Sequence, residues 1–309
     1  MLPYALLFAQ GATGPGIEAR NGKTFLRLTP AMRVLFAQIG SPLSHVDLLV
    51  DRVTDSATYL VYSYRLVNSG TSRGGAARIS ADVSAPAGTG FPILPATGGF
   101  WHGAGFPGVQ LSTFRDHVPI GPISPPNWEA ALMREATVDW YGARGGASGE
   151  YDSIPPGGTL RGFGLRSSYL AGIRAFWAQP TFRSCCGTPR PATPKREVEY
   201  PDPSEFRLAG WTIAPTVRPQ VMTIGVLRTD LDQVCSTLHW ISDGAVCGSL
   251  QGALNRAIGA AQRGDRAGVT DGLHAILEII DAQHGAGKPV NDNAYWLLKV
   301  NTAYLIAHL

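Results

Sequence analysis

The residues of this 309-residue chain that could do chemistry begin with a histidine in a glycine-rich segment. Trp101-His-Gly-Ala-Gly105 has the composition of an oxyanion-hole loop, and His102 or His117 could act as a general base. A hydrolase of this kind also needs a nucleophile, which a G-x-S-x-G turn usually supplies. The sequence has this pattern once, at Gly70-Thr-Ser-Arg-Gly74, but between two expected strands rather than between a strand and a helix, which is the setting that such a nucleophile turn needs. A hydrolase is therefore the third interpretation, and a glycine-rich loop that exposes Trp101 is favoured over it.

Acidic residues in the strand-rich part of the chain are a second source of chemistry. They are Glu129, Glu135, Asp139, Glu150 and Asp152. Two carboxylates could cleave a glycosidic bond if they lay ~5 to 9 Å apart, but the sequence does not show which pair would do so. Asp230 and Asp232 lie on an expected helix and lack the loop of oxygen ligands that calcium needs. Solvated acidic positions are favoured, and no catalytic residue, metal or cofactor is predicted.

Four cysteines form a further group, and two of them lie twelve positions apart, at Cys235 and Cys247. No CxxC or HxxxH spacing favours zinc, so pairing in an oxidising compartment is the favoured interpretation. Asp243-Gly244 marks a turn between two expected helices, and a Cys235–Cys247 disulfide would staple that helix hairpin, stabilising it by roughly 2 to 3 kcal/mol. The adjacent Cys185 and Cys186 could close a vicinal ring or stay free, in a Pro-rich stretch that does not favour a reactive thiol.

Aromatic side chains favour binding rather than catalysis. Trp101, Phe106 and Trp128 lie near expected loops and are the candidate ligand-binding residues. Exposed aromatic rings of this kind could stack on sugar rings. Trp140 and Trp177 lie inside strand patterns, where burial in the core is the alternative. Burial of both Trp101 and Trp128 would remove the sugar-binding interpretation.

Charge and hydropathy limit the classes of partner. The formal net charge is +3, only 16% of residues are charged, and no Lys/Arg-rich run concentrates the basic residues. A nucleic-acid partner is therefore not predicted. No stretch approaches the ~20 apolar residues of a membrane span. The apolar run from Leu2, followed by small residues at Ala9 and Gly11, is typical of a truncated secretory signal, although it could also be a first strand.

The elements that must position these residues change in character near Gln220. Before it, runs rich in β-branched and aromatic residues alternate with Gly- and Pro-rich turns, which indicates an antiparallel sandwich. The main expected strands cover residues 46–53, 58–67, 78–83, 137–141, 159–165 and 172–178. In the second of these, the predicted core face carries Leu60, Tyr62, Tyr64 and Leu66.

After Val226 the apolar residues follow helical spacing. Two amphipathic helices are expected around residues 250–261 and 269–280, with Gly264 between them. An opening helix over 227–240 and a last helix after Pro289 complete a four-helix unit. Either Gly248 or Ser249 is expected to cap the first amphipathic helix, and Gly285 and Gly287 are expected to end the second.

The predicted fold class is α+β: an antiparallel β-sandwich followed by a small disulfide-stapled helical bundle. The expected divisions of the chain are a leader over 1–19, a sandwich domain over 20–217 and a helical domain over 222–309. A Pro-rich exposed loop is expected over 185–204 within the sandwich domain.

Two short motifs have simple structural interpretations. Asn21-Gly-Lys-Thr24 resembles the end of a phosphate-binding loop, but it lacks the required glycine spacing, the preceding strand and the following helix. A hairpin turn is favoured there. Arg263-Gly-Asp265 spells an integrin-recognition tripeptide. At a joint between helices, however, Gly264 suits the position after a helix end and Asp265 suits an N-cap, which accounts for it without a receptor.

Two longer segments resemble parts of bacterial exported proteins. The stretch from Ile154-Pro-Pro-Gly-Gly-Thr to Gly172-Ile-Arg-Ala-Phe-Trp, together with Tyr62-Ser-Tyr-Arg-Leu-Val-Asn68, resembles a signature of exported β-sandwich domains. The helical segment from Cys247 to about Ile280 is similar to FIVAR-type modules at the ends of bacterial cell-surface proteins, although Gln251 stands where those modules usually have Lys. The two resemblances cover about half of the chain. They imply location and architecture rather than an activity.

The favoured function is that of a non-catalytic, secreted or cell-surface structural or adhesive protein. Its sheet edges and exposed aromatic residues would engage a partner, and its helical unit would act as a spacer or docking piece. The expected partners are a further copy of the chain, as an oligomer or fibre, a cell-surface component or a polysaccharide. A carbohydrate-binding module is the alternative.

Overall fold

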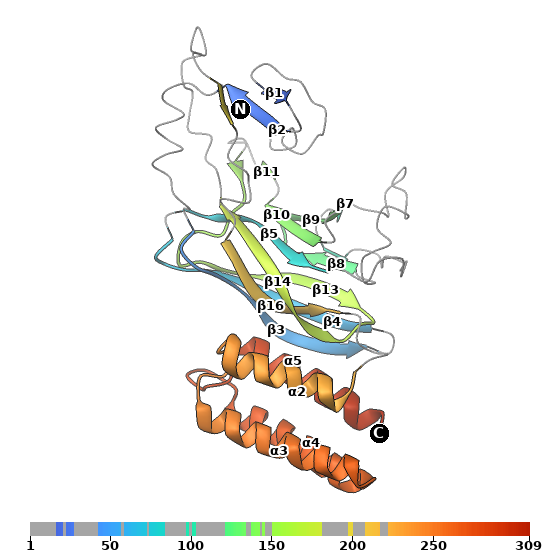
Figure 1. Ribbon diagram of the computed structural model, residues 1–309. Helices are drawn as coiled ribbons and strands as arrows, with labels where there is room; N and C mark the ends of the chain where they lie inside the picture. Colours follow the sequence, from blue (N-terminus) through green and yellow to red (C-terminus); the bar gives the residue numbers. More distant parts are fainter. Residues whose placement is uncertain are drawn as a thin grey trace.

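A computed structural model describes the chain over residues 17–20, 23–27, 43–56, 59–72, 74–83, 97–98, 101–102, 121–133, 137–142, 144–145, 150–180, 197–199, 208–216 and 222–309. Two β-sheets stack on each other, and a set of helices lies against one side of them (Figure 1). The residues that form these layers come in the expected order, with strands first and helices last.

One layer is a five-stranded sheet with the order β3-β4-β13-β8-β6. Its strands are β3 (Val46–Ser56), β4 (Tyr59–Asn68), β13 (Thr159–Ser167), β8 (Gly121–Ser124) and β6 (Thr97–Gly98). All neighbours are antiparallel except β6 and β8. The edges of this sheet are therefore the long strand β3 and the two-residue strand β6.

The second layer is a six-stranded sheet with the order β16-β14-β5-β10-β9-β7. Its strands are β16 (Leu208–Pro215), β14 (Ala171–Pro180), β5 (Ala76–Asp82), β10 (Thr137–Gly142), β9 (Trp128–Met133) and β7 (Trp101–His102). Its neighbours are antiparallel except β7 and β9. The long edge strand β16 lies beside β3 of the first sheet.

Two small sheets complete the strand-rich part. They are β1 (Ile17–Arg20), β2 (Lys23–Arg27) and β15 (Glu197–Glu199), and the pair β11 (Arg144–Gly145) and β12 (Glu150–Tyr151). In the first, Arg20 is opposite Lys23 in an antiparallel pair. The antiparallel pairing of β1 with β2 fits a hairpin at the Asn-Gly-Lys-Thr motif, although its Asn21 and Gly22 lie outside the described residues.

The core between the sheets forms because successive strand residues point to opposite faces. On β4, Tyr62, Tyr64 and Leu66 are fully buried, which confirms the predicted core face. The Tyr64 hydroxyl donates to the Ile213 carbonyl of the other sheet at 3.0 Å. Burial raises the pKa of this hydroxyl well above its ordinary value, so it stays protonated and able to donate.

The pairing of β13 with β4 contains a β-bulge. The register shifts between Arg161 and Phe163, and the residue between them, Gly162, has φ +99°. A residue with a side chain is strained in that conformation. At Gly164 an added Cβ would lie 2.7 Å from the Tyr62 carbonyl oxygen, so glycine is needed for the close approach of β13 to β4.

The C-terminal part folds into helices close to the expected ranges. They are α2 (Ile224–Asp232), which continues into the π-helical turn η4 (Gln233–Thr237), then α3 (Gly244–Gln262), α4 (Arg266–Gln283) and α5 (Asp292–Ala307). Gly264 has φ +71° and Asp265 caps α4, which confirms the helix-joint interpretation of the Arg-Gly-Asp tripeptide.

The predicted cap of the first amphipathic helix is wrong. Asp243 caps α3, accepting a hydrogen bond from the Ala245 amide, so the helix begins at Gly244. Ser249 lies inside the helix and donates its hydroxyl to the Ala245 carbonyl. An aspartate before the first helical residue is a strong N-cap, so the helix extends past the serine.

The disulfide between Cys235 and Cys247 is present, as predicted. It joins η4 to α3 across a Cα–Cα distance of 6.0 Å. Cys185 and Cys186 lie outside the described residues. The fold class is therefore confirmed: an α+β chain with an antiparallel sandwich and a disulfide-stapled helical bundle.

The helices divide into two that lie near the sandwich and two that lie farther away. α5 contacts β3, β14 and β16, and α2 packs beside α5, while α3 and α4 pair with each other on the far side (Figure 1). Buried apolar residues of the strands and of the helices form one continuous cluster. The junction between α5 and the sandwich is thus part of the core.

Candidate functional site

The junction of α5 with the sandwich holds a set of polar contacts between segments that are far apart in the chain, and it begins with an edge strand. β3 is the edge of its sheet, and its register with β4 shifts between Val50 and Arg52, which leaves Asp51 as a bulged residue. An edge strand presents backbone N–H and C=O groups that have no partner within the sheet. When such groups are buried they require other partners.

Asn293, in the first turn of α5, supplies those partners. Its Oδ1 accepts from the Val50 amide at 2.9 Å, and its Nδ2 donates to the Leu48 carbonyl at 3.2 Å. The side chain is 1% exposed. A carboxamide carries the same donor and acceptor as a peptide group. Asn293 therefore pairs with β3 in the way that one residue of a further strand would.

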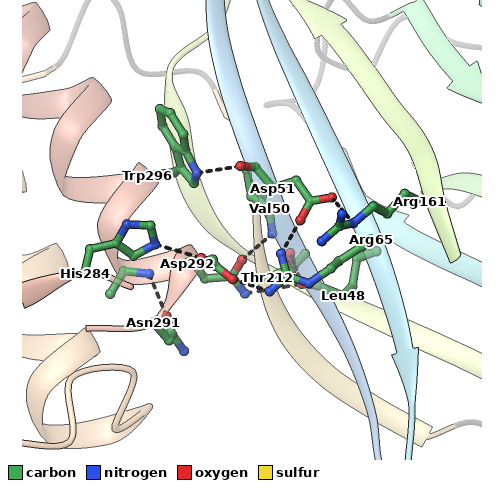
Figure 2. Close-up of polar contacts among 12 residues, drawn as sticks. Leu48, Val50, Asp51, Arg65, Arg161, Thr212, His284, Asn291, Asp292 and Trp296 are labelled. Carbon is green, nitrogen blue, oxygen red and sulfur yellow. Dashed lines mark hydrogen bonds and ion pairs between the residues drawn. The ribbon is translucent and has the colours of Figure 1, made fainter. Parts of the chain in front are cut away.

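Neighbouring side chains extend this attachment. The Trp296 indole donates to the Asp51 carbonyl at 3.2 Å, at the bulge (Figure 2). The Thr212 hydroxyl on β16 donates to the same Leu48 carbonyl at 2.7 Å, which connects the two sheets. Two turns along α5, Asn301 donates to the Ala171 carbonyl at the start of β14. One face of α5 thus bonds to the backbone of both sheets.

A chain of charged side chains runs beside these bonds. Arg65 on β4 binds Asp51 through Nη1 and Asp292 through Nη2, so one guanidinium bridges the sandwich and α5 (Figure 2). Arg161 on β13 also binds Asp51, at 3.1 Å. On the helical side, His284 Nε2 lies 2.7 Å from Asp292 Oδ1.

The environment of Asp292 favours its charged form. Burial alone would raise its pKa, but hydrogen bonds from His284 and Arg65 outweigh burial and lower the pKa below its ordinary value. Asp292 is also the first residue of α5, where the positive end of the helix dipole favours a carboxylate. The pKa of Arg65 is raised: burial opposes this, and its bonds to Asp292 and Asp51 outweigh burial.

A second cluster supports the first from within the helical unit. The His284 ring stacks on Tyr295, with centroids 3.8 Å apart and planes at 8°. The Tyr295 hydroxyl donates to Asp281 at 2.7 Å, and Lys299 lies 2.8 Å from the same carboxylate. This arrangement fixes the end of α4 against α5 and so holds His284 beside Asp292.

The chemistry of the junction is that of attachment. Asp51 and Asp292 both bind guanidinium groups, and the lowered pKa of Asp292 makes that carboxylate a weak base. Within the described ranges, no group of three or more His, Cys, Asp or Glu side chains is arranged to hold a metal ion. The bonds that the junction does make, to strand backbone and between charges, hold the helical unit at one position on the sandwich.

Of the sequence-predicted ligand-binding residues, only Trp128 has a described side chain, and it does not lie at this site. Trp128 on β9 is 3% exposed, and its ring contacts Phe163 edge to face at 5.0 Å in the core. Its prediction as an exposed sugar platform is therefore wrong, because the strand turns this ring between the sheets. Trp101 forms part of β7 and pairs with Ala130, but only its backbone is described. Phe106 lies outside the described residues.

Two of the candidate acids, Asp139 and Glu129, lie on β10 and β9, apart from the junction. Asp139 on β10 is buried and is bound by Arg78 and by the Thr137 hydroxyl. Glu129 lies on the neighbouring strand β9, and its hydrogen bond to Tyr141 contributes, after burial, to raising the pKa of that phenol. Trp140 is fully buried, as its strand pattern indicated.

The sequence analysis did not identify Trp211, Asn293 or the pairing of Asp292 with Arg65. Trp211 on β16 is 53% exposed, although it lies in a strand pattern. Asn293 follows the predicted helix start, where a polar residue is ordinary, so its type carried no signal. Asp292 and Arg65 are 227 positions apart, and nothing local to either residue indicates the pairing.

No helix in the described part of the chain is long and apolar enough to cross a membrane. The chain matches no known protein family, curated protein or solved structure. Its function must therefore be inferred from its own geometry.

Replacing Asn293 by Ala should destabilise the chain strongly. The change leaves the buried Val50 amide without an acceptor, which costs about 2 to 3 kcal/mol in the free energy of unfolding. Urea denaturation measures this difference. The matched control is Asn255→Ala on the exposed side of α3, which should stay within about 0.5 kcal/mol of wild type. Equal stability of the two variants would show that Asn293 does not support the β3 edge.

Replacing Asp292 by Asn should have an effect that depends on pH. Because the folded-state pKa of Asp292 is lowered, its carboxylate stabilises the chain fully above the ordinary pKa of about 3.9. This contribution is lost as the pH falls through the folded-state pKa. We expect Asp292→Asn to be about 1 kcal/mol less stable than wild type at neutral pH, with the difference shrinking below about pH 4.

Urea denaturation at neutral and acid pH tests this expectation. Asp271→Asn, at an exposed position on α4, is the control and should match wild type throughout. A gap between wild type and Asp292→Asn that stays constant into acid would contradict the assigned charge of Asp292.

Proposed function

We propose that this chain is a non-catalytic structural or adhesive protein of the cell surface or extracellular space, which binds a partner through the faces of its β-sandwich. The observation that carries the proposal is the covering of the β3 edge by Asn293 and Trp296 of α5. A fold whose helices are bonded to its sheet backbone is a rigid carrier for a binding surface.

The strand edges support binding through faces rather than through edges. At one side of the sandwich, β3 and β16 lie against each other and against α5. At the other side, the last strands in the sheet orders are β6 and β7, each two residues long. Covered edges and very short edge strands are two ways in which proteins avoid edge-to-edge pairing. The covering of β3 therefore favours the faces of the sandwich over this edge as the binding surface.

The extracellular location is supported by the Cys235–Cys247 disulfide, because disulfides persist mainly in oxidising compartments. The similarity of the helical unit to FIVAR-type modules of cell-surface proteins stays a prediction. It favours the same location.

A carbohydrate-binding role is the second candidate, and it now depends on Trp211 instead of Trp128. Gly210 and Thr212 face the core, where Phe176 fills the space beside Gly210, so Trp211 between them faces outward. Trp211 is opposite Ala175 on β14, and Trp177, half-buried, is its diagonal neighbour on the same face. Two indoles beside a small residue offer an apolar surface on which a sugar ring can stack.

The proposed function predicts binding without turnover. In co-sedimentation with intact bacterial cells and with insoluble polysaccharides, we expect the oxidised chain to be retained and no reducing sugar to be released. Release of sugar would contradict the non-catalytic proposal.

Light scattering and negative-stain microscopy across a concentration series should show a monomer, and fibres of the wild-type chain would contradict binding through faces.

Trp211→Ala separates the two candidates. If the sugar-binding candidate is correct, this variant loses polysaccharide binding while its melting temperature stays near that of wild type, because the ring is mostly exposed. Trp211→Phe keeps an aromatic face and should retain most of the binding. Polysaccharide binding that is unchanged in Trp211→Ala would exclude a sugar platform at this position.

A further inference from the structure

Arg166 on β13 lies on the outer face of the five-stranded sheet. Its neighbours along the strand, Leu165 and Ser167, are buried on the core side, so Arg166 points the other way. Across the sheet it is opposite Val61 on β4 and Gly121 on β8. Neither neighbour offers a hydrogen-bonding side chain to the guanidinium.

Two N–H groups of this guanidinium lack a partner. Nε and Nη2 are buried from solvent and make no hydrogen bond in the described part of the chain. The guanidinium lies over the Tyr59 ring, 5.7 Å from its centroid, which holds the cation in place but satisfies neither N–H group. Buried polar groups are nearly always paired, and an unpaired charged donor is the more costly case. The site therefore lacks the acceptor atoms that would complete its hydrogen bonds.

The missing partner can be identified by comparison with Arg78. On the other sheet, Arg78 uses the same two atoms, Nε and Nη2, to bind the Asp139 carboxylate. These two N–H groups form one side of the planar guanidinium and match the two oxygens of a carboxylate. The same side of the Arg166 guanidinium is held in place by Tyr59, but no described carboxylate binds it.

The charge around Arg166 favours an anion. On the same outer face, Arg65 and Arg161 are bound by Asp51 and Asp292. Arg52 on β3 is exposed, and no described carboxylate binds it. Arg52 and Arg166 are two strands apart, which is about 10 Å across the sheet. This face therefore carries two positive charges that the described residues do not neutralise.

We propose that Arg166, stacked on Tyr59, is a binding site for a carboxylate group of an acidic ligand, with Arg52 as a second, exposed contact for the same ligand. The carboxylate accepts from Nε and Nη2 of Arg166, as Asp139 accepts from Arg78. This site does not depend on the proposed adhesive role and stands or falls on its own measurement.

The test follows the Arg166 Nε–H signal in ¹H–¹⁵N NMR spectra of the full chain. The probes are acetate, glucuronate and sulfate, each titrated against sodium chloride at constant ionic strength. We expect a saturable shift of the Arg166 signal with acetate and glucuronate. The Arg78 signal should not move, because its Nε is already bound by Asp139. Tighter binding of glucuronate than of acetate would assign the carboxylate to an acidic sugar.

Variants check the assignment. Arg166→Gln should weaken glucuronate binding at least about tenfold, since hydrogen bonds to charged groups are lost. Arg166→Lys keeps the charge without the paired donors and should also bind weakly. Arg228→Gln, at an exposed position on α2, should bind as wild type does. The absence of a saturable Arg166 shift with either carboxylate, or binding of sulfate alone, overturns the proposal even if a variant fails to fold.

Discussion

The structure depends on one constraint: the backbone of β3 must be hydrogen-bonded although no strand in the described part of the chain lies beyond it. A sandwich of two open sheets has strands at its sides whose polar groups face outward. Here α5 covers that side, and its Asn293 carboxamide bonds to the strand as a peptide group would. The helical unit therefore supplies hydrogen bonds that the open edge of the sandwich needs.

The ion pairs at the junction determine how α5 is aligned along β3. Arg65 binds one carboxylate from the sheet and one from the helix, so only one relative position of the two satisfies it. Ion pairs that are partly buried contribute little net stability, because desolvation offsets much of their attraction. Their value at this junction is that they select one alignment of α5 along β3. The apolar contacts around them supply most of the stabilisation.

Much of the fold could be predicted from sequence, because its signals are local. Alternation on β4, helical spacing after Val226 and the two cysteines each depend on neighbouring residues, and the structure confirms all three. The candidate site could not be predicted in this way. Asn293 looks like an ordinary first-turn residue, and Trp128 looks like a residue near a loop, until the pairing of distant strands determines what surrounds each of them.

The attachment of α5 also has a consequence for the order in which the chain can fold. Asn293 and Val50 are 243 positions apart, so β3, the third strand in chain order, is hydrogen-bonded by the last helix, α5. Contacts between such distant segments form late, because a long loop must close before they contribute. Synthesis of the strands alone therefore leaves β3 as an open edge. The native state is reached only after the C-terminal helices are present, so the strands and helices must complete their folding together.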